Sequence, residues 1–326
     1  MWEPIALDDI RAAGERIAGL ALRTPLVQLE IKDAPCMVYV KLENLQPIGS
    51  FKIRGAGNAM ALADPRELEA GVWTASAGNM AQGVAWHARR LGIPCAVVVP
   101  DTAPRAKRDA IERLGARLVP VPFDEWFEVF TTRRHAEMNG VFVHPFSDPA
   151  VMAGNGTIGL EVLEDLPDVE SVVVPYGGGG LLGGIASGLR AASPSVRVYA
   201  CEVDTAAPLA PALEAGRPVD VEYRPSFVDG IGARTVLPEM LHLVRRLVDG
   251  SILVSVDQVA GAVRLLAERG RVVAEGAGAT SLAAALTGRA GEGKVACVVS
   301  GGNIDPDKLA AVLGGGVPEA ATARRS

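Results

Sequence analysis

The chain has 326 residues, a formal net charge of -6 and hydrophobic residues at 49% of its positions. That length suits one large α/β unit or two joined lobes. The negative charge excludes the broad basic face that non-specific nucleic-acid binding requires. The first residues lack the basic and apolar regions of a signal peptide, and no purely apolar run reaches the roughly 18 residues of a membrane span. We therefore expect a cytoplasmic protein that binds neither nucleic acid nor a membrane.

The cysteines predict neither disulfides nor a zinc site. Cys36, Cys95, Cys201 and Cys297 form no CxxC pair, and no histidine cluster lies near any of them. Runs such as CAVVVP and VACVVS are typical of strands that bury a thiol, because free cysteine packs as a small hydrophobic residue.

Short Val-rich runs alternate with helix-length segments along the chain. Apolar spacing predicts helices at residues 81–92 and 156–167. The Val-rich runs predict strands at residues 37–43, 71–76, 95–100, 117–121, 171–175, 196–202 and 294–300. Near-continuous apolar strands that alternate with helices indicate an α/β fold with open, twisted, mostly parallel sheets that helices flank on both faces.

The spacing of these elements suggests two lobes. Several strand–helix units fall between residues 55 and 149, and we interpret this segment as a small inserted domain. The large domain is then made of residues 1–54 and 150–326. We expect the small and polar tail from residue 314 onward to fray.

The first segment with unusual chemistry is LENLQPIGSFKIRGAGN, where a strand, a loop and a helix start follow one another. Lys52 lies in the first helical turn, between Phe51 and Ile53. Burial and the positive end of a helix dipole both favour a neutral amine, which is the form that makes a Schiff base. The alternative is an ordinary surface lysine at a helix start.

The second segment, TASAGNMAQG, reads as a strand, a turn of small residues and a helix. Its backbone N–H groups from Ser76 to Asn79 suit a carboxylate or a phosphate. The Asn79 amide is also able to bond a phenolic oxygen. An ordinary helix-capping turn is the alternative.

The third segment, SVVVPYGGGGLLGG, has four consecutive glycines between a buried strand and a helix. Such a run costs backbone entropy and is best explained by close approach to an anion. A rival reading takes Gly178, Gly180 and Gly183 as a GxGxxG motif, with Glu202 as the ribose-binding acid of an NAD-dependent dehydrogenase. That reading leaves Lys52 unexplained.

The fourth segment is KVACVVSGGN, a strand that ends at Ser300. The Ser300 hydroxyl could face a ring nitrogen, and a simple strand-end turn is the alternative. Together the four segments, with GTIGLE and the EGAGA around Glu275, resemble the serine/threonine dehydratase family of fold-type II pyridoxal-phosphate enzymes. The resemblance runs from RTPL near the start of the chain to SGGN near its end.

The resemblance implies a tryptophan synthase β-like fold whose large domain holds pyridoxal 5'-phosphate, with Lys52 as the Schiff-base lysine. It implies that the cofactor contacts Phe51, Lys52, Asn79, Gly177, Gly178, Gly179, Gly180, Leu181, Glu275 and Ser300. It also implies that the amino-acid substrate contacts Ser76, Ala77, Gly78, Asn79 and Met80.

The family chemistry is the elimination of a β-hydroxyl, which turns L-threonine or L-serine into a 2-keto acid and ammonia. The resemblance gives Lys52 the role of the general base at the α-carbon. A serine at the ring nitrogen, unlike an acid, does not keep that nitrogen protonated, which favours elimination over transamination. Relatives commonly form homodimers, and we expect one here.

Three positions depart from the family pattern. Met80 replaces the usual histidine, and Tyr176 stands where a small aliphatic residue is common, so 3-hydroxyaspartate or phenylserine is an alternative substrate. Ala77 replaces the second base of the related serine racemases, which ranks racemisation below elimination. A β-replacement synthase and a non-catalytic relative are further alternatives.

Some family members bind a divalent cation through a Glu, a carbonyl and an Asp. The matching positions here are Glu202, Ala206 and Pro208. Proline offers no side-chain oxygen, so we predict no metal site, and Glu202 and Ala206 remain the only candidate ligands.

Overall fold

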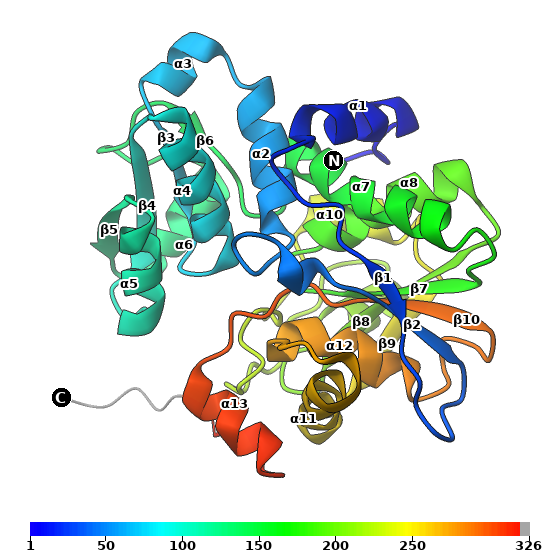
Figure 1. Cartoon of the computed structure of the whole chain (residues 1–326). Coiled ribbons are helices and arrows are strands. Elements are labelled where there is room, and N and C mark those ends of the chain that lie inside the picture. The colour runs from blue at the N-terminus through cyan, green and yellow to red at the C-terminus, as the bar shows by residue number, and fades with distance from the viewer. Residues whose placement is uncertain (320–326) are drawn as a thin grey trace.

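Two sheets organise residues 1–319, which are the part of the chain that the computed structural model describes (Figure 1). The larger sheet has six strands, of which only β1 runs antiparallel to its neighbour. In spatial order these strands are β1 (Leu26–Gln28), β2 (Met37–Lys41), β10 (Lys294–Val298), β7 (Ser171–Pro175), β8 (Arg197–Val203) and β9 (Gly250–Val254).

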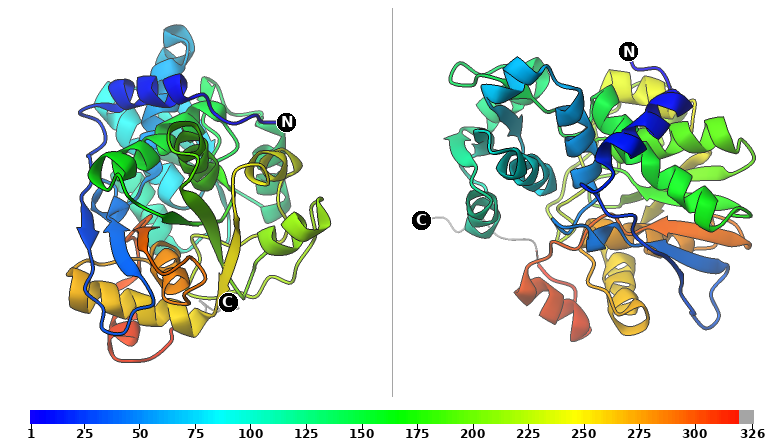
Figure 2. Two further views of the ribbon diagram at one scale, coloured as in Figure 1. Left: turned by 90° about the vertical axis from the view of Figure 1, so that its right-hand side faces the viewer. Right: turned by 45° about the horizontal axis from the view of Figure 1, so that its top comes forward.

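The smaller sheet has four strands, and all of its pairs are parallel. In spatial order they are β5 (Arg117–Val121), β4 (Cys95–Pro100), β3 (Val72–Ala75) and β6 (Val141–Phe142). Figures 1 and 2 show this sheet and its helices as a lobe beside the larger one. The arrangement confirms the predicted α/β class with mostly parallel sheets.

Helices cover both faces of the large sheet (Figure 1). On one face lie α1 (Leu7–Ile17), α7 (Pro149–Asp165), α8 (Gly180–Ala192) and α10 (Pro238–Val244), and on the other lie α11 (Val256–Leu265), α12 (Gly276–Ala285) and α13 (Pro306–Leu313). The short elements α9 (Leu209–Ala215), η1 (Glu43–Leu45) and η2 (Leu266–Gly270) complete this lobe. The small lobe has α2 (Lys52–Leu62), α3 (Pro65–Glu69), α4 (Asn79–Leu91), α5 (Arg105–Arg113) and α6 (Phe123–Thr132).

The core explains why the central strands are apolar throughout. Every residue of β7 is buried; Val172 and Val174 pack into the core under α7 and α8, while Val173 packs into the core on the opposite face. A strand that is covered on both faces needs apolar residues at successive positions rather than at alternate ones.

All of the predicted strands are present, at β2, β3, β4, β5, β7, β8 and β10, while β1, β6 and β9 were not predicted. The strands of the small sheet fall between Val72 and Phe142, inside the predicted inserted segment. The domain limits at residues 54/55 and 149/150 stay a prediction. Of the tail that we expect to fray, residues 320–326 lie outside the described part.

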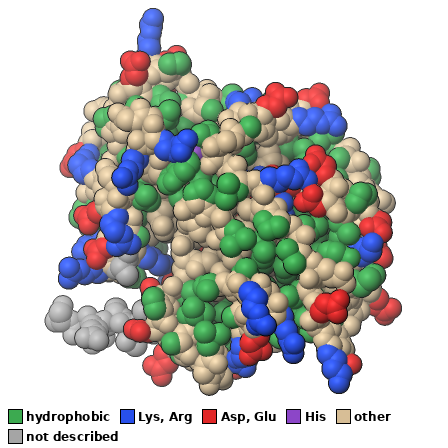
Figure 3. Space-filling view, in the orientation of Figure 1, with side chains coloured by type: hydrophobic (Ala, Val, Ile, Leu, Met, Phe, Trp, Pro, Cys, Tyr) green, Lys and Arg blue, Asp and Glu red, His purple; other side chains and the backbone are tan. Residues whose placement is uncertain are grey.

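Within residues 1–319, no helix combines the length and the apolar character that crossing a membrane requires. On the face shown in Figure 3, basic and acidic side chains are interspersed. The cysteines are unpaired; Cys36, Cys201 and Cys297 are buried, and Cys95 is half-buried.

Candidate active site

The loop that carries Lys52 is joined to the loop that carries Ser300. The Phe51 N–H donates to the Ser300 carbonyl at 3.0 Å, and the Gly302 N–H donates to the Gly49 carbonyl at 2.9 Å. Ser300 is 3% exposed, so its hydroxyl lies inside the molecule beside the start of α2. The first and fourth segments of the sequence therefore form one wall of a site.

Lys52 is the first residue of α2, and its side chain is half-buried. Its Nζ donates to the Pro145 carbonyl at 2.5 Å and stands 5.2 Å from the centre of the Phe51 ring. Burial lowers the pKa of the Lys52 amine to about 8, against the opposing attraction of Glu275. A substantial neutral fraction near physiological pH gives a nucleophile or a base.

Asn79 joins the second segment to the fourth. Its Nδ2 donates to Glu275 Oε1 at 2.9 Å, and its Oδ1 accepts from Asn303 Nδ2 at 2.8 Å. Burial, together with repulsion from Asp229, raises the pKa of Glu275 to about 7, although the hydrogen bond from Asn79 opposes the shift. The sequence prediction did not include Asn303, although it is the last residue of the SGGN motif.

The turn before α4 presents backbone donors. The Gly78 N–H donates to Ser76 Oγ at 3.2 Å. Within the described residues, the N–H groups of Ala77, Asn79 and Met80 have no hydrogen-bond acceptor. Free N–H groups at a helix start attract a carboxylate or a phosphate.

The glycine loop, residues 177–181, presents a second set of donors at the start of α8. Gly179 has a φ of +92°, in the left-handed region that glycine tolerates best. Along the part of the chain that the structure covers, no acceptor meets the N–H groups of Gly177, Gly178, Gly179, Gly180 and Leu181. This loop is therefore a candidate anion cradle.

A short segment that the sequence prediction missed lies between the glycine loop and Glu275. A Cβ on Gly177 would stand 3.4 Å from Ile231 Cα, and one on Gly230 would stand 3.5 Å from Glu275 Oε1. All four predicted segments therefore surround one place in the fold, and residues 230–231 add to them.

Two side chains at which this chain departs from the family pattern are buried. The Met80 side chain is 1% exposed and packs in a core cluster with Met60, Val84 and Val151, so only its backbone faces the turn. Tyr176 is 2% exposed and packs beneath the glycine loop beside Met240. Neither side chain forms the surface of the site, because both fill the core behind it.

The Glu202 carboxylate already accepts hydrogen bonds from nearby groups of the protein. Its two oxygens accept from the N–H groups of Leu209 and Ala210 at 2.7 and 3.0 Å, and from Ser251 Oγ at 2.7 Å. Ala206 is buried, at 4% exposure. Among the described residues, no group of three or more His, Cys, Asp or Glu could hold a metal ion. Glu202 therefore has the role of an internal cap for α9 rather than of a free ribose-binding acid.

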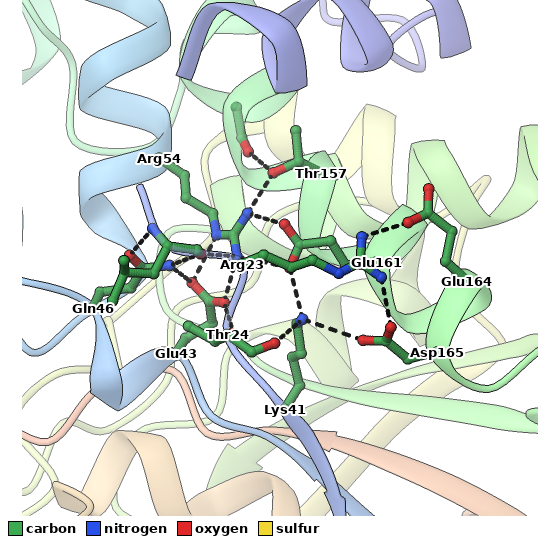
Figure 4. Close-up of polar contacts among 12 residues, drawn as sticks. Arg23, Thr24, Lys41, Glu43, Gln46, Arg54, Thr157, Glu161, Glu164 and Asp165 are labelled. Carbon is green, nitrogen blue, oxygen red and sulfur yellow. Dashed lines mark hydrogen bonds and ion pairs between the residues drawn. The ribbon is translucent and has the colours of Figure 1, made fainter. Parts of the chain in front are cut away.

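A buried ionic cluster holds α2 against the large lobe (Figure 4). Arg54 Nε and one Nη donate to both oxygens of Glu43 at 2.8 Å, and the guanidinium also reaches Glu161 at 2.6 and 2.9 Å. Lys41 Nζ lies 2.6 Å from Glu161 Oε2. Since Arg54 follows Lys52 by two residues, the cluster fixes the helix turn from which the Lys52 side chain extends.

A family model described as "Pyridoxal-phosphate dependent enzyme" matches residues 17–301. The chain belongs to the pyridoxal-phosphate dependent enzymes. The L-threonine ammonia-lyase of Thermotoga maritima is 42% identical over 318 residues, which cover 96% of this chain and 79% of that protein. The catabolic L-threonine dehydratase of Escherichia coli (strain K12) is 36% identical, over 95% of this chain and 97% of that protein. A solved structure of maize serine racemase has a TM-score of 0.87 at 33% identity, over 94% of this chain and 96% of that one.

As a pyridoxal-phosphate enzyme of fold type II, this protein needs a lysine and a cradle for a phosphate. The Lys52 amine, whose pKa is lowered to about 8, and the unpaired N–H groups of the glycine loop meet these needs. A Cβ on Gly178 would stand 2.2 Å from the Phe146 ring, and one on Gly180 would stand 2.5 Å from the Phe146 carbonyl oxygen. The bare main chain of the loop is thus required by packing, and the residues present fit the cofactor.

Replacing Gly180 by alanine should weaken cofactor binding without unfolding the large lobe. The added Cβ would also lie 2.8 Å from the Phe146 Cα, so the main chain of the loop must shift. We expect this shift to cost about 1–3 kcal/mol, which is roughly a ten- to hundredfold loss of affinity for the cofactor. Absorbance titration with pyridoxal phosphate measures the effect. Gly261→Ala in α11 is the matched control, because nothing lies within 4 Å of its added Cβ. Equal affinities in the two variants would contradict this role of Gly180.

Proposed function

We propose that this enzyme is an ammonia-lyase that removes the β-hydroxyl of L-threonine or L-serine and releases a 2-keto acid and ammonia. The observation that carries the proposal is that contacts join the Lys52 loop to two separate sets of unpaired N–H groups. Pro145, which accepts from the Lys52 amine, precedes the Phe146 that packs on the glycine loop, and Asn79 of the turn at Ala77–Met80 bonds to Asn303 of the Ser300 segment. Relatives named threonine ammonia-lyase and threonine dehydratase match nearly the whole chain, which supports the same chemistry.

The residues have distinct proposed roles. The N–H groups of the glycine loop hold the cofactor phosphate, and those of Ala77, Asn79 and Met80 hold the substrate carboxylate. Lys52 would hold the cofactor covalently and, once free, would take the proton from the substrate α-carbon as general base. Bound pyridoxal phosphate supplies an electron sink for the negative charge that develops at that carbon.

The environment of the cofactor ring is proposed to favour elimination. Ser300 offers a hydroxyl to the ring nitrogen, and a hydroxyl, unlike a carboxylate, does not keep that nitrogen protonated. The Asn79 amide, which bonds to Glu275 and Asn303, would hold the ring hydroxyl. With a ring nitrogen that is not kept protonated, the bound cofactor would withdraw less charge from the α-carbon, which would favour loss of the β-hydroxyl over transamination.

The positions of Ala77 and Met80 bear on the alternatives. Ala77 has no acid or base to offer from the second face of the α-carbon, so racemisation ranks below elimination despite the similarity to a serine racemase. The Met80 side chain lies in the core, which removes one reason to expect 3-hydroxyaspartate or phenylserine. Threonine and serine are therefore the favoured substrates.

We also propose that the enzyme acts in the cytoplasm as a homodimer. The unpaired cysteines support a reducing compartment. Sedimentation of the purified holoenzyme measures the number of chains, and a species of one chain would contradict the dimer.

The test of the proposed activity is 2-keto acid release by purified protein with added pyridoxal phosphate. We expect release from L-threonine or L-serine to exceed that from threo-3-hydroxyaspartate and phenylserine. Release only from the last two would keep the chemistry and change the substrate. No release from any of them, with the cofactor covalently bound, would reject the proposed reaction and direct attention to synthase or racemase assays.

The rate at which the apoenzyme bonds covalently to pyridoxal phosphate should rise as the pH passes through about 8. The reacting form is the neutral amine, and the pKa of Lys52 is lowered to about 8, so the rate increases from pH 7 to 9 and then levels. At pH 7 the neutral fraction of Lys52 is roughly 200-fold larger than that of a lysine with an ordinary pKa of about 10.4. Stopped-flow absorbance at each pH gives the profile, and a rate still rising steeply at pH 10 would contradict the lowered pKa.

A further inference from the structure

One short linker contacts both parts of the cofactor site. Residues 144–147 connect β6 of the small sheet to α7 of the large lobe, and we call them the lobe linker. The Pro145 carbonyl accepts from Lys52 Nζ at 2.5 Å. The next residue, Phe146, lies against Gly178 and Gly180 so closely that neither glycine could carry a Cβ. The lobe linker therefore sets the distance between the Lys52 amine and the glycine loop.

His144 shapes the lobe linker from inside. Its Nδ1 accepts from the N–H of Phe146 at 3.2 Å and from the N–H of Ser147 at 2.9 Å. These two bonds close a tight turn around Pro145. Because Nδ1 accepts both of them, the ring proton is on Nε2.

The surroundings of His144 keep its ring uncharged. The side chain is 2% exposed, and the rings of Phe130, Phe142 and Phe146 have their centres 4.8, 6.0 and 4.9 Å from it. Burial, with repulsion from Arg133 and Lys52, lowers the pKa of His144 to about 3. The imidazole therefore stays neutral, and its Nδ1 remains a hydrogen-bond acceptor, at any pH well above 3.

The far end of the lobe linker is anchored by Ser147, which is fully buried. Its Oγ accepts from Trp2 Nε1 at 2.9 Å and donates to Glu239 Oε1 at 2.9 Å. Arg133 donates to its carbonyl at 2.7 Å. The turn is therefore held from both ends, and the residue inside it decides where the Pro145 carbonyl points.

We propose that His144 is a positioning residue of this enzyme. By accepting the N–H groups of Phe146 and Ser147, it holds the Pro145 carbonyl against the Lys52 amine and the Phe146 ring against the glycine loop. It acts through the lobe linker, because its Nδ1 accepts hydrogen bonds from that linker's backbone. The inference rests on the proposed role of Lys52 as the lysine that bonds to the cofactor.

Variants at position 144 test the proposal with the full-length protein. His144→Leu fills the space but leaves two buried N–H groups without an acceptor, and should weaken pyridoxal-phosphate binding about tenfold or more. His144→Asn places an amide oxygen near the position of Nδ1, and should restore affinity to within about threefold of wild type. His144→Gln places its amide near the position of Nε2 and should resemble His144→Leu.

Phe142→Leu is the matched control. It removes part of the ring cluster around His144 and costs stability by loss of packing, but leaves the two Nδ1 bonds intact. The measurements are the cofactor dissociation constant, the rate of covalent attachment and the unfolding midpoint. We expect His144→Leu and Phe142→Leu to lower the midpoint alike, while only His144→Leu weakens cofactor binding and slows attachment.

Several outcomes would overturn the inference. One is a His144→Leu variant that binds the cofactor as Phe142→Leu does. Another is an Asn variant no better than the Gln variant, a comparison that decides the matter even if the Leu variant does not fold. A wild type that binds pyridoxal phosphate but never bonds to it through Lys52 would instead reject the proposed function.

Discussion

Replacing Lys52 by alanine is expected to abolish covalent attachment of pyridoxal phosphate and to lower 2-keto acid release at least about 10³-fold. The change removes the group proposed both to bond to the cofactor and to take the α-proton. The buried amine, with its pKa lowered to about 8, is the best placed group in the site for both tasks. Borohydride reduction followed by mass spectrometry of the peptides locates the modified lysine.

Two variants separate the chemistry of Lys52 from its charge. Lys52→Arg keeps a cation but cannot bond to the cofactor, so it should be as inactive as the alanine variant. Lys294→Ala removes a lysine that forms only an exposed ion pair with Asp168, and should retain full activity. Normal turnover in either Lys52 variant would show that another group performs the reaction.

The central strands could be predicted because they are apolar at successive positions along the sequence. The run SVVVP is apolar at almost every position because both faces of β7 are covered. The missed strand β9 is an edge strand in which Leu253 is 40% exposed, and β6 has only two residues. Short or half-exposed strands leave too few apolar residues in a row to be distinguished from loops.

The site segments could be predicted individually, but the contacts that join them could not. Glycine runs and helix starts are local features, and each has its own chemistry. The hydrogen bond from Lys52 to Pro145 joins residues 93 positions apart, and that from Asn79 to Glu275 joins residues 196 apart. No spacing along the chain encodes such pairs, because they depend on how the two lobes pack together.

Met80 shows how a motif can mislead about a side chain. Its place beside Asn79 in the turn suggested a pocket residue, but Met80 and Val84 lie four apart on α4 and share one buried face. That helical spacing was visible in the sequence and favoured the core. Backbone and side chain of one residue can thus serve different purposes at a helix start.

Replacing Arg54 by methionine is expected to lower the free energy of unfolding by about 3–5 kcal/mol. The change keeps most of the apolar volume of the side chain. It leaves the carboxylate of Glu43, which is 0% exposed, without its guanidinium partner (Figure 4). Thr24 and Gln46, which also donate to Glu43, and the nearby charge of Lys41 cannot replace the bidentate pair. Urea titration measures the loss. Because the helix of Lys52 begins at this cluster, weaker cofactor binding should accompany it.

The effect of Arg54→Met should depend on pH in a defined direction. Burial acts to raise the pKa of Glu43, but attraction and hydrogen bonds from Arg54 outweigh it, so the folded-state pKa is lowered. In the wild type this stabilisation is present above the unfolded pKa of about 4.3 and is lost as the pH falls through the folded pKa. Without Arg54, burial favours the protonated form of the Glu43 carboxyl. The variant should therefore lose the least free energy of unfolding at low pH. The stability gap between the two proteins should therefore narrow below about pH 5.

Arg23→Met is the matched control, since it makes the same change at the exposed edge of the same group of charges. Arg23 pairs with Glu164 and Asp165 at 2.5 Å, yet its side chain is 50% exposed. Exposed pairs contribute about 0–1 kcal/mol, because water screens them and their side chains lose entropy when held. Equal losses in the free energy of unfolding for the variants at positions 23 and 54 would mean that the charge itself, and not its burial, stabilises the fold. A much larger loss at position 54 would assign the stability of the Lys52 helix to the buried pair with Glu43 and Glu161.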